Sequence, residues 1–451
     1  MKRTGWFAVG KLFVVSVIIS CSGSTSSLDG GDAPTDAGTA TDGGPRDAGT
    51  ANDAGSGDAG TVTDAGSGDA GAATDAGSED AGSAWSPPQS LVDDIGRLAI
   101  GNHVHLVGHL GGQLVHRRSI DNGATWTSPV VIAPAAGNFP GMYGGLVADG
   151  DSVYLITAND DMASSASVGG RPLSFRKSSD NGATWSAPVQ VTTTPIFRAR
   201  MAARGSFIHV AGVGNPTSNP TYWYFRSTNG GTTWTATALA TNLGTYGGGQ
   251  TIAVDPMTGT VHAAYTDANG SIGAGPTWYR RSTDNGMTWS LPVSIGENTA
   301  QSSRQARVQL TAADGRVFAS WQREPTMSGG TLPADRIGYN RSADDGQTWG
   351  TAQVLPGDTG VDRNHQHVWM ASGGGVHFVW RHGDSGDSVP DPAGYMFSPD
   401  YGATWGPRIF AVDTTATLGS NHPWSIVANA RAVHVLTGPS GAMQLSSKPI
   451  P

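Results

Sequence analysis

The chain has 451 residues, a net charge of −9 at neutral pH and a single cysteine. This length exceeds one ordinary domain, so a large domain with additional segments is expected. The single cysteine excludes an intramolecular disulfide bond and any metal site built from several cysteines. Residues 29–83 hold eleven Asp, one Glu and one Arg, so the acidic balance lies there. The nearly neutral remainder offers no broad basic surface for nucleic acid.

Residues 1–20 have the features of an export signal. Basic residues near the start precede the apolar run LFVVSVII at 12–19, and the small residue Ser20 precedes Cys21. This run is too short to span a bilayer. The sequence IISC resembles a bacterial lipobox, in which the signal is cleaved before the cysteine and the thiol is acylated. We therefore expect a lipid on Cys21 that alone holds the protein at the bacterial outer membrane or cell surface, with a plain secretory signal as the alternative.

Residues 21–84 are predicted to form a disordered linker. They consist mainly of Asp, Ala, Gly, Thr and Ser, and no apolar periodicity is present. Such a segment cannot bury enough apolar surface to offset the loss of chain entropy on folding. A flexible coil of this length spans roughly 40 Å on average. The segment would therefore hold the rest of the protein away from the membrane.

From Trp85 onward the chain is dominated by a repeat of the form Ser-x-Asp-x-Gly-x-Thr-Trp. The tryptophans of successive copies are 49 to 60 residues apart, which suits one four-stranded unit of a propeller with variable loops. Short β-rich runs precede and follow each copy, and helical periodicity is not sustained after residue 20. The pattern predicts an all-β fold of four-stranded antiparallel sheets. The copies begin at Ser119, Ser178, Ser227, Ser282, Ser342 and Ser398.

The two ends of the repeat region predict the number of sheets. After the sixth copy, three further β-rich runs lie within 422–447 and no motif follows them. The run WSPPQSLV at 85–92 resembles the sequence WSAPVQVT at 185–192, which begins at the tryptophan of a motif and continues after it. We therefore predict a seven-bladed propeller over 85–451, in which the N-terminal strand completes the last blade and removes the exposed sheet edges. A six-bladed ring with a surplus hairpin is the alternative.

Over residues 85–448 the chain resembles the BNR or Asp-box repeat proteins of the sialidase superfamily. The motif itself predicts a hairpin turn, in which the aspartate accepts hydrogen bonds from turn amides and hydroxyls while the glycine adopts a positive φ. An asparagine in the third copy is compatible with hydrogen bonding and not with a repeated acid–base role. We therefore expect a structural role for Asp121, Asp180, Asn229, Asp284, Asp344 and Asp400.

Functional residues are expected on the opposite face, where blade-specific loops surround the centre of a propeller. Arginine is frequent there, and guanidinium groups grip a carboxylate with two hydrogen bonds. This composition predicts that the partner is an acidic glycan carrying sialic or uronic acid. The alternative for each arginine is a structural salt bridge. The candidate carboxylate- or glycan-binding residues are Arg97, Arg198, Arg200, Arg304, Arg307, His365 and His367.

The resemblance implies a sialidase reaction, with arginine on the first inner strand, a Tyr nucleophile activated by Glu, and an Asp acid–base in the first blade. Arg97 fits, whereas the loop after HVHLVGH offers His109 and no carboxylate, and such a loss removes a factor of about 10²–10⁴ in rate. A polysaccharide lyase that works by β-elimination and a non-catalytic lectin are the alternatives. No cofactor or metal site is expected, and the protein is predicted to be a monomer. The candidate catalytic residues are His109, Tyr143, Tyr246 and Glu324.

Overall fold

The structure is a computed structural model that describes residues 85–134, 145–158, 171–214, 220–243, 249–267, 276–297, 303–325, 336–356, 368–381, 393–410, 423–438 and 443–450. Within these ranges the chain forms strands and turns, and no helix is present. Accordingly, no described helix has the length and apolar character needed to cross a membrane. The predicted signal at 1–20, the lipidation site Cys21 and the linker at 21–84 lie outside the described residues.

The first strands of the chain form a four-stranded antiparallel sheet and a larger sheet. The four-stranded sheet consists of β1 (Asp94–Ile100), β2 (Val104–Leu110), β3 (Gln113–Ser119) and β4 (Val130–Ala133). The seven-stranded sheet consists of β5 (Leu146–Asp149), β6 (Ser152–Ala158), β7 (Arg171–Ser178), β8 (Val189–Arg204), β9 (Phe207–Gly214), β10 (Thr221–Ser227) and β11 (Thr235–Ala240).

The later strands form three four-stranded sheets and one three-stranded sheet, all antiparallel. The first two are β12 (Gln250–Val254), β13 (Val261–Thr266), β14 (Thr277–Ser282) and β15 (Val293–Ser294), then β16 (Ser303–Ala313), β17 (Arg316–Pro325), β18 (Arg336–Ser342) and β19 (Gln353–Val354). The last two are β20 (Val368–Ser372), β21 (Val376–Arg381), β22 (Ala393–Ser398) and β23 (Ile409–Phe410), then β24 (Pro423–Ala428), β25 (Ala432–Thr437) and β26 (Gln444–Pro449). The predicted all-β fold is confirmed for the described residues, and four of the six described sheets have the predicted four antiparallel strands.

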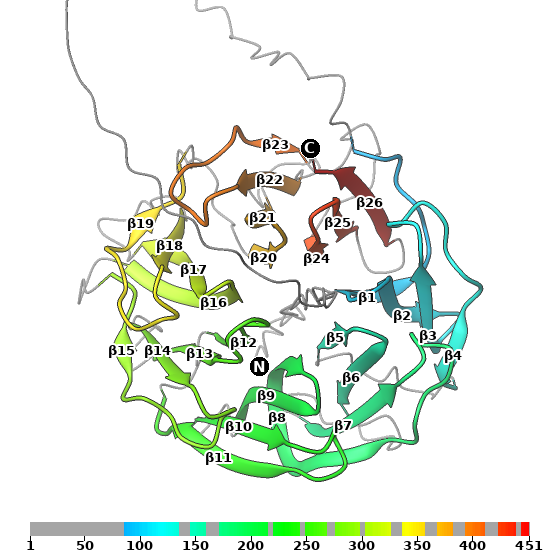
Figure 1. Ribbon diagram of the computed structural model, residues 1–451, viewed down its shortest axis with the longest axis horizontal. Coiled ribbons are helices and arrows are strands. Elements are labelled where there is room, and N and C mark those ends of the chain that lie inside the picture. The colour runs from blue at the N-terminus through cyan, green and yellow to red at the C-terminus, as the bar shows by residue number, and fades with distance from the viewer. Residues whose placement is uncertain are drawn as a thin grey trace, which may run out of the picture. The chain divides into compact units, whose positions relative to one another are not determined.

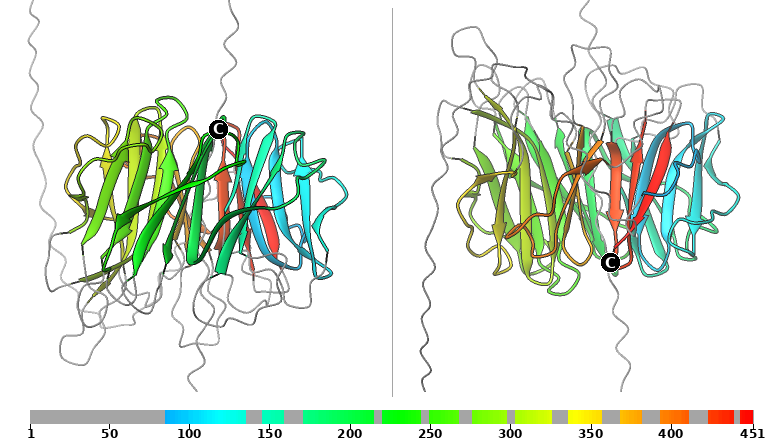
Figure 2. Two further views of the ribbon diagram at one scale, coloured as in Figure 1. Left: turned by 90° about the horizontal axis from the view of Figure 1, so that it is seen from below. Right: turned by 90° about the horizontal axis from the view of Figure 1, so that it is seen from above.

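The sheets stand around a common axis, with the first strand of each sheet nearest to that axis (Figure 1). The inner strands β1, β5, β8, β12, β16, β20 and β24 each contact the next one, and β24 contacts β1. Strand β8 pairs with β7 through its first half and with β9 through its second half, and the β8–β9 register shifts between Phe197 and Arg200. The strands run between the two edges of the ring (Figure 2).

The segment before β1 lies against the last sheet. Gln89 and Leu445 form an antiparallel bridge, with backbone hydrogen bonds of 2.9 Å in both directions. The amide of Ser86 donates to the Ser447 carbonyl at 2.7 Å. The two ends of the described chain are therefore joined on β26.

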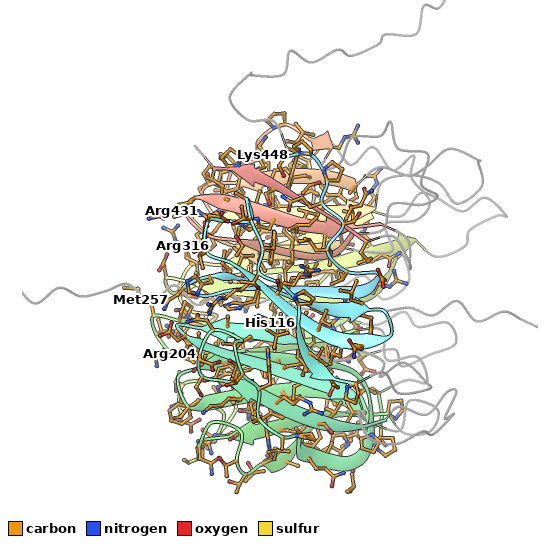
Figure 3. The ribbon with its side chains drawn as sticks, turned by 90° about the vertical axis from the view of Figure 1, so that its right-hand side faces the viewer. His116, Arg204, Met257, Arg316, Arg431 and Lys448 are labelled. Atoms are coloured by element: carbon orange, nitrogen blue, oxygen red, sulfur yellow. The ribbon has the colours of Figure 1, made fainter. Side chains whose placement is uncertain are left out.

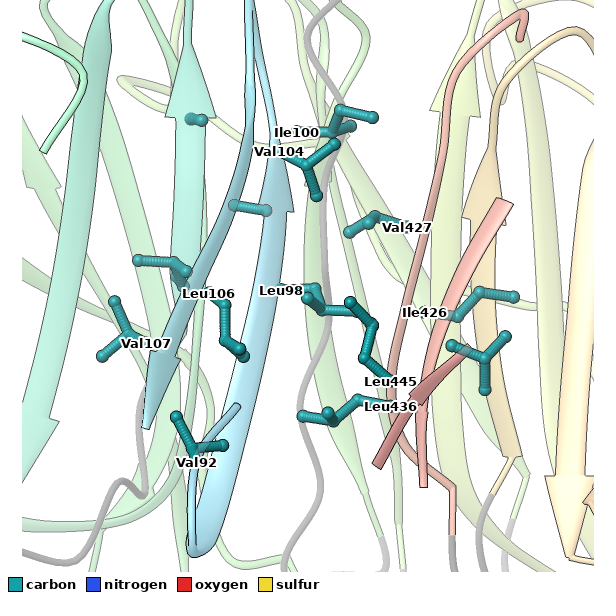
Figure 4. Packing of buried hydrophobic residues seen from close by; sticks show 14 of the residues in the cluster. Val92, Leu98, Ile100, Val104, Leu106, Val107, Ile426, Val427, Leu436 and Leu445 are labelled. Carbon is teal, nitrogen blue, oxygen red and sulfur yellow. The ribbon is translucent and has the colours of Figure 1, made fainter. Parts of the chain in front are cut away.

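Apolar side chains fill the space between neighbouring sheets. Leu98 and Leu106 of the first sheet lie beside Leu436 and Leu445 of the last sheet, and all four are buried (Figure 4). Burial of one such side chain stabilises the fold by roughly 1.5–3 kcal/mol. This packing holds the first sheet and the last sheet together without any covalent link.

Each Asp-box motif forms a closed set of hydrogen bonds within its own turn. In the first copy, the Ser119 hydroxyl donates to Asp121 Oδ1 at 2.7 Å, and the Thr125 amide donates to the same oxygen at 2.8 Å. The Thr125 hydroxyl donates to Asp121 Oδ2 at 2.5 Å. These hydrogen bonds lower the pKa of Asp121 to about 2, and the largest contribution comes from the Thr125 side chain. The carboxylate is therefore occupied by its turn and stays ionised.

The third copy shows what an asparagine does in this turn. Asn229 Oδ1 accepts from the Ser227 hydroxyl and from the Thr233 amide, both at 3.0 Å. Its Nδ2 then donates to Thr233 Oγ1 at 2.9 Å, so the donor and the acceptor are exchanged relative to the aspartate copies. The turn keeps its geometry without a negative charge.

Each turn also packs on the third strand of the preceding sheet. The glycine at the fifth motif position leaves room for an aromatic ring there, and the motif tryptophan packs edge-on against the same ring. A Cβ on Gly286 would lie 1.7 Å from the Tyr224 hydroxyl, and the Trp289 ring centroid lies 4.9 Å from that of Tyr224. The equivalent pairs are Gly182 with His116, Gly231 with Phe175 and Gly346 with Tyr279, whereas Gly402 faces Phe318 of the second strand β17.

Buried histidines recur on the second strands of the sheets. His209 and Tyr224 share a hydrogen bond of 2.7 Å, and His377 shares one of 2.7 Å with Tyr395. Burial lowers the pKa of His209 to about 3, assisted by the nearby Arg226, and lowers the pKa of His377 to about 4. These imidazoles are therefore neutral in the folded protein at neutral pH. The full set is His105, His209, His262, His377 and His434.

The four of these histidines whose pKa is lowered predict a loss of stability in mild acid; they are His105, His209, His377 and His434. The unfolded histidines take up protons below a pH of about 6.5, whereas the folded ones with lowered pKa cannot until a pH of about 4. Each such residue should lower the free energy of unfolding by about 2 kcal/mol between about pH 8 and about pH 5. Urea unfolding at both pH values measures this fall. His377→Asn should show a smaller fall than the wild type, and an equal fall would contradict the assignment.

Candidate functional site

The ring has two edges with different contents. The mouth edge is defined here as the edge at which β1, β8, β12 and β16 begin and β2, β9, β13 and β17 end. The Asp-box turns lie at the opposite edge, which also carries the labelled Arg204, Met257, Arg316 and Arg431 (Figure 3). Candidate binding and catalytic residues were predicted for the mouth edge, so the described side chains there are considered first.

Arg97 and Arg200 occupy equivalent positions on two inner strands. Each follows a register shift in its strand, and each is only 1% exposed. Arg97 Nη1 donates to the Gly96 carbonyl at 2.7 Å, and Arg200 Nη1 donates to the Ala199 carbonyl at 3.3 Å. The register shifts place two guanidinium groups at the same level of the ring. A hydrogen bond between either guanidinium group and an anion is strengthened, because the buried surroundings have a low dielectric constant.

His109 lies within β2 and not in a loop, and it is 1% exposed. The connection to β3 is a two-residue turn of Gly111 and Gly112, with φ values of 57° and 78°. The backbone amide of Gly111 donates to Asp93 Oδ2 at 2.8 Å, and the Asp93 amide donates to the His109 carbonyl at 2.7 Å. The structure therefore brings an exposed carboxylate to the first hairpin, where the sequence between the two strands offers none.

A cluster of Tyr and Arg lies between the β9–β11 strands and the β12–β15 sheet. The rings of Tyr222 and Tyr265 have centroids 5.3 Å apart, and the Tyr222 hydroxyl donates to the Thr251 carbonyl at 2.8 Å. Burial raises the pKa of Tyr265, although its hydrogen bond with Arg280 acts in the opposite direction. These tyrosines are therefore protonated at neutral pH, and the Tyr222 proton is already donated to Thr251.

A further pair of charges joins two sheets at the mouth edge. Arg323 Nε donates to Glu297 Oε2 at 2.7 Å, and both side chains are partly buried. Arg307, on β16, has a φ of 56° and is partly buried. Arg323 is thus engaged in an ion pair, as the salt-bridge alternative states, and Glu297 is its partner.

Several predicted residues cannot be compared with these positions. Arg198, Arg304 and Glu324 belong to strands β8, β16 and β17, but their side chains lie outside the described part of the structure. Tyr143, Tyr246, His365 and His367 are themselves outside the described residues. No cluster of three or more His, Cys, Asp or Glu suited to a metal ion occurs among the residues that are described.

From the sequence, Asp93 was expected at the mouth edge only as a salt-bridge partner of arginine, and Tyr222, Tyr265 and Arg280 were not expected at the site. Asp93 directly precedes β1, four residues before Arg97, and the Gly-Gly turn after β2 requires the two strands to meet closely. Those two signals together would have placed the carboxylate at the first hairpin. The two tyrosines meet only because neighbouring sheets pack together, which no local pattern reveals.

No protein-family model matches the chain, and no curated protein matches it. Among solved structures, the chain is similar to polysaccharide lyase Uly1, with a TM-score of 0.52 and 8% identity over 79% of this chain and 89% of that chain. This likeness concerns the fold. The fold is a β-propeller.

Two further solved structures are similar to this propeller. An ulvan lyase of polysaccharide lyase family PL25 has a TM-score of 0.45 and 12% identity, covering 65% of this chain and 76% of that chain. A Hadza microbial sialidase has a TM-score of 0.38 and 14% identity, covering 79% of this chain and 66% of that chain. With TM-scores below 0.5, these two add no argument about the reaction.

Proposed function

We propose that this chain is a surface-tethered, sialidase-like propeller that binds an acidic glycan at its mouth edge and hydrolyses it. The observation that carries the proposal is the position of Asp93. Its exposed carboxylate lies at the first hairpin, four residues before the buried Arg97. A cation and a carboxylate on one hairpin are the pair that hydrolysis of an acidic sugar needs.

The roles follow from the chemistry of the side chains. Arg97 and Arg200 are always charged and suit the carboxylate of a sialic or uronic acid. Asp93 is exposed and would exchange a proton with the glycosidic oxygen or with the attacking water, a contribution of about 10²–10⁴ in rate. Tyr265, which packs on the fully buried Tyr222, would line the sugar ring between the neighbouring sheets. Arg198, Arg304, Arg307, His365 and His367 remain proposed glycan-binding residues, and Tyr143, Tyr246 and Glu324 remain proposed catalytic residues.

A polysaccharide lyase is the second candidate, and His109 favours it. Its strand β2 pairs with β1, and its register partner Asp94 lies three residues before Arg97. β-Elimination next to a uronate requires a cation on the carboxylate and a His or Tyr that moves protons. Polysaccharide lyase Uly1 has this fold, which supports the same candidate.

One assay on the full chain distinguishes these candidates. The protein is incubated with sialosides and, separately, with uronate polysaccharides. Release of free sialic acid is expected for the hydrolase. An unsaturated uronate that absorbs in the ultraviolet would instead establish the lyase, and binding without turnover would establish a lectin. Failure to bind any of these ligands would overturn the proposal of an acidic glycan.

We also propose that the propeller has seven blades. The cycle of inner-strand contacts supports this count, as does β8, whose two halves belong to successive four-stranded units. The bridge between Gln89 and Leu445 supports closure of the last blade by the N-terminal strand. A crystal structure tests the count, and six blades with a surplus hairpin would contradict it.

The proposed tether is a lipid on Cys21. Metabolic labelling of bacteria with a radioactive fatty acid should label the wild-type protein and leave Cys21→Ser unlabelled. The membrane fraction should lose the protein in the same variant. A labelled Cys21→Ser variant would contradict the proposal and favour a plain secretory signal.

A further inference from the structure

A seam is defined here as the line along which two successive groups of strands pack against each other. At the Asp-box edge, the seam between the β5–β7 strands and the β9–β11 strands differs from three others. At three other seams an arginine just before the motif serine donates to a backbone carbonyl of the next turn: Arg118 to Asn181 at 3.5 Å, Arg226 to Asn285 at 2.6 Å and Arg281 to Asp345 at 3.1 Å. Here Lys177 stands in that place. Within the described residues, its ammonium makes no hydrogen bond or ion pair.

The facing turn is also smaller at this seam. The fourth motif position is Gly230, with a φ of 67°, whereas four of the other copies use a side chain there that contacts the preceding sheet. These contacts are Asn122 with Asn429, Asn181 with His103, Asp345 with Thr260 and the Tyr401 ring with Arg316. The exchange of arginine for lysine and of a side chain for glycine leaves space on both sides of one seam.

That space is a cavity of about 350 Å³, within the size range of small-molecule sites. Lys177, Asp149, Ser152 and Ser206 line it with polar groups. The Gly205 amide donates to Asp149 Oδ2 at 2.5 Å, while Oδ1 accepts no hydrogen bond from the described residues. The cavity therefore offers a strong donor, a strong acceptor and hydroxyl groups that can do both.

A second cavity of about 460 Å³ shares Lys177 and Gly230 with the first. It adds Trp185 and Asp180, whose carboxylate accepts hydrogen bonds from its own turn. Aromatic faces pack on the apolar faces of sugar rings, and paired donors and acceptors match vicinal hydroxyls. Two carboxylates flank the single ammonium, which disfavours an anionic ligand.

We propose that the cavity around Lys177 binds one uncharged sugar unit. Lys177 donates to a ring hydroxyl and Asp149 accepts from its neighbour, with the ring lying toward Trp185. The site is at the Asp-box edge, so it is separate from the proposed glycan site at the mouth edge and does not depend on it. A polysaccharide would then be held by one unit while another part of it reaches the mouth edge.

Binding is tested on the full chain with a panel of methyl glycosides of neutral hexoses, by calorimetry and saturation-transfer NMR. At least one glycoside is expected to bind. Gly230→Asn should weaken it at least about tenfold, because the new side chain fills the cavity. The fold should tolerate this change, since asparagine accepts a positive φ and only the flexible end of Lys177 lies within 4 Å of the new Cβ.

The control is Arg226→Lys, which makes the same exchange of cation at the equivalent position of the next strand set, and it should bind the glycoside as the wild type does. Inorganic phosphate serves as the anionic probe. Equal binding by Gly230→Asn would overturn the proposal. So would binding of phosphate at Lys177 without binding of any glycoside. Asp93→Asn should leave glycoside binding unchanged, so a failure at the mouth edge is distinguishable from a failure here.

Discussion

Replacing Gly286 by alanine should destabilise the propeller by about 4 kcal/mol or more. The new Cβ would lie 1.7 Å from the Tyr224 hydroxyl, so this ring must move. Movement breaks the buried hydrogen bond of 2.7 Å between Tyr224 and His209, which costs about 1–3 kcal/mol. Overpacking adds about 1–3 kcal/mol, and a φ of 79° adds about 1–2 kcal/mol for a residue with a Cβ. Chemical denaturation at neutral pH measures the change.

The matched control is Gly315→Ala. Gly315 has a φ of 70°, close to that of Gly286, but nothing lies within 4 Å of the position that an added Cβ would take. Its substitution should therefore cost only the conformational part, about 1–2 kcal/mol. Equal losses in the two variants would show that the packing of turn against ring contributes little, and would contradict the account of the seams.

The second large effect concerns the reaction. Asp93→Asn should lower kcat by about 10²–10⁴-fold on the glycan that the wild type cleaves, because the amide cannot exchange a proton at the first hairpin. The hydrogen bond from the Gly111 amide at 2.8 Å is kept, since the amide oxygen of asparagine can accept it. The fold should therefore remain, and KM should change little. Steady-state kinetics over a range of pH checks the expectation.

The control for this variant is Asp314→Asn. Asp314 is an exposed residue in the β16–β17 turn, with a φ of 55° that asparagine adopts as readily. This turn lies at the Asp-box edge, so activity should be unchanged. If Asp93→Asn retained the activity of the wild type, the proton-transfer role of Asp93 would be wrong. If it also produced an unsaturated uronate, the reaction would be the elimination assigned to His109.

The sheets could be predicted from the sequence because the residues that form each turn lie close together in the sequence. In the first copy, Ser119, Asp121, Gly123 and Thr125 bond within one turn, and Trp126 starts the next run. A pattern of this kind needs no distant residue to be interpreted. The repeated Val-His on the second strands is also local, and it would have revealed the buried histidines had it been compared between repeats.

The candidate site could be predicted only by residue type. Arg97 and Arg200 were selected for their charge, but their common level depends on register shifts in β1 and β8 that composition does not encode. Asp93 reaches the first hairpin through a backbone contact with another strand. The cavity around Lys177 arises because two small changes face each other across a seam, and each alone is ordinary in sequence.

The pairing of residues 86–89 with β26 has a consequence for folding. Residues 86–89 are made long before Leu445, so the strand pairing between them must wait until almost the whole chain has left the ribosome. Contacts between residues so far apart in sequence slow folding, since the loop must close before the contact stabilises it. Until then β26 presents an unpaired edge, which a second chain can occupy. Peptides copying 85–92 should therefore inhibit refolding, by occupying the edge of β26 with which residues 86–89 pair last.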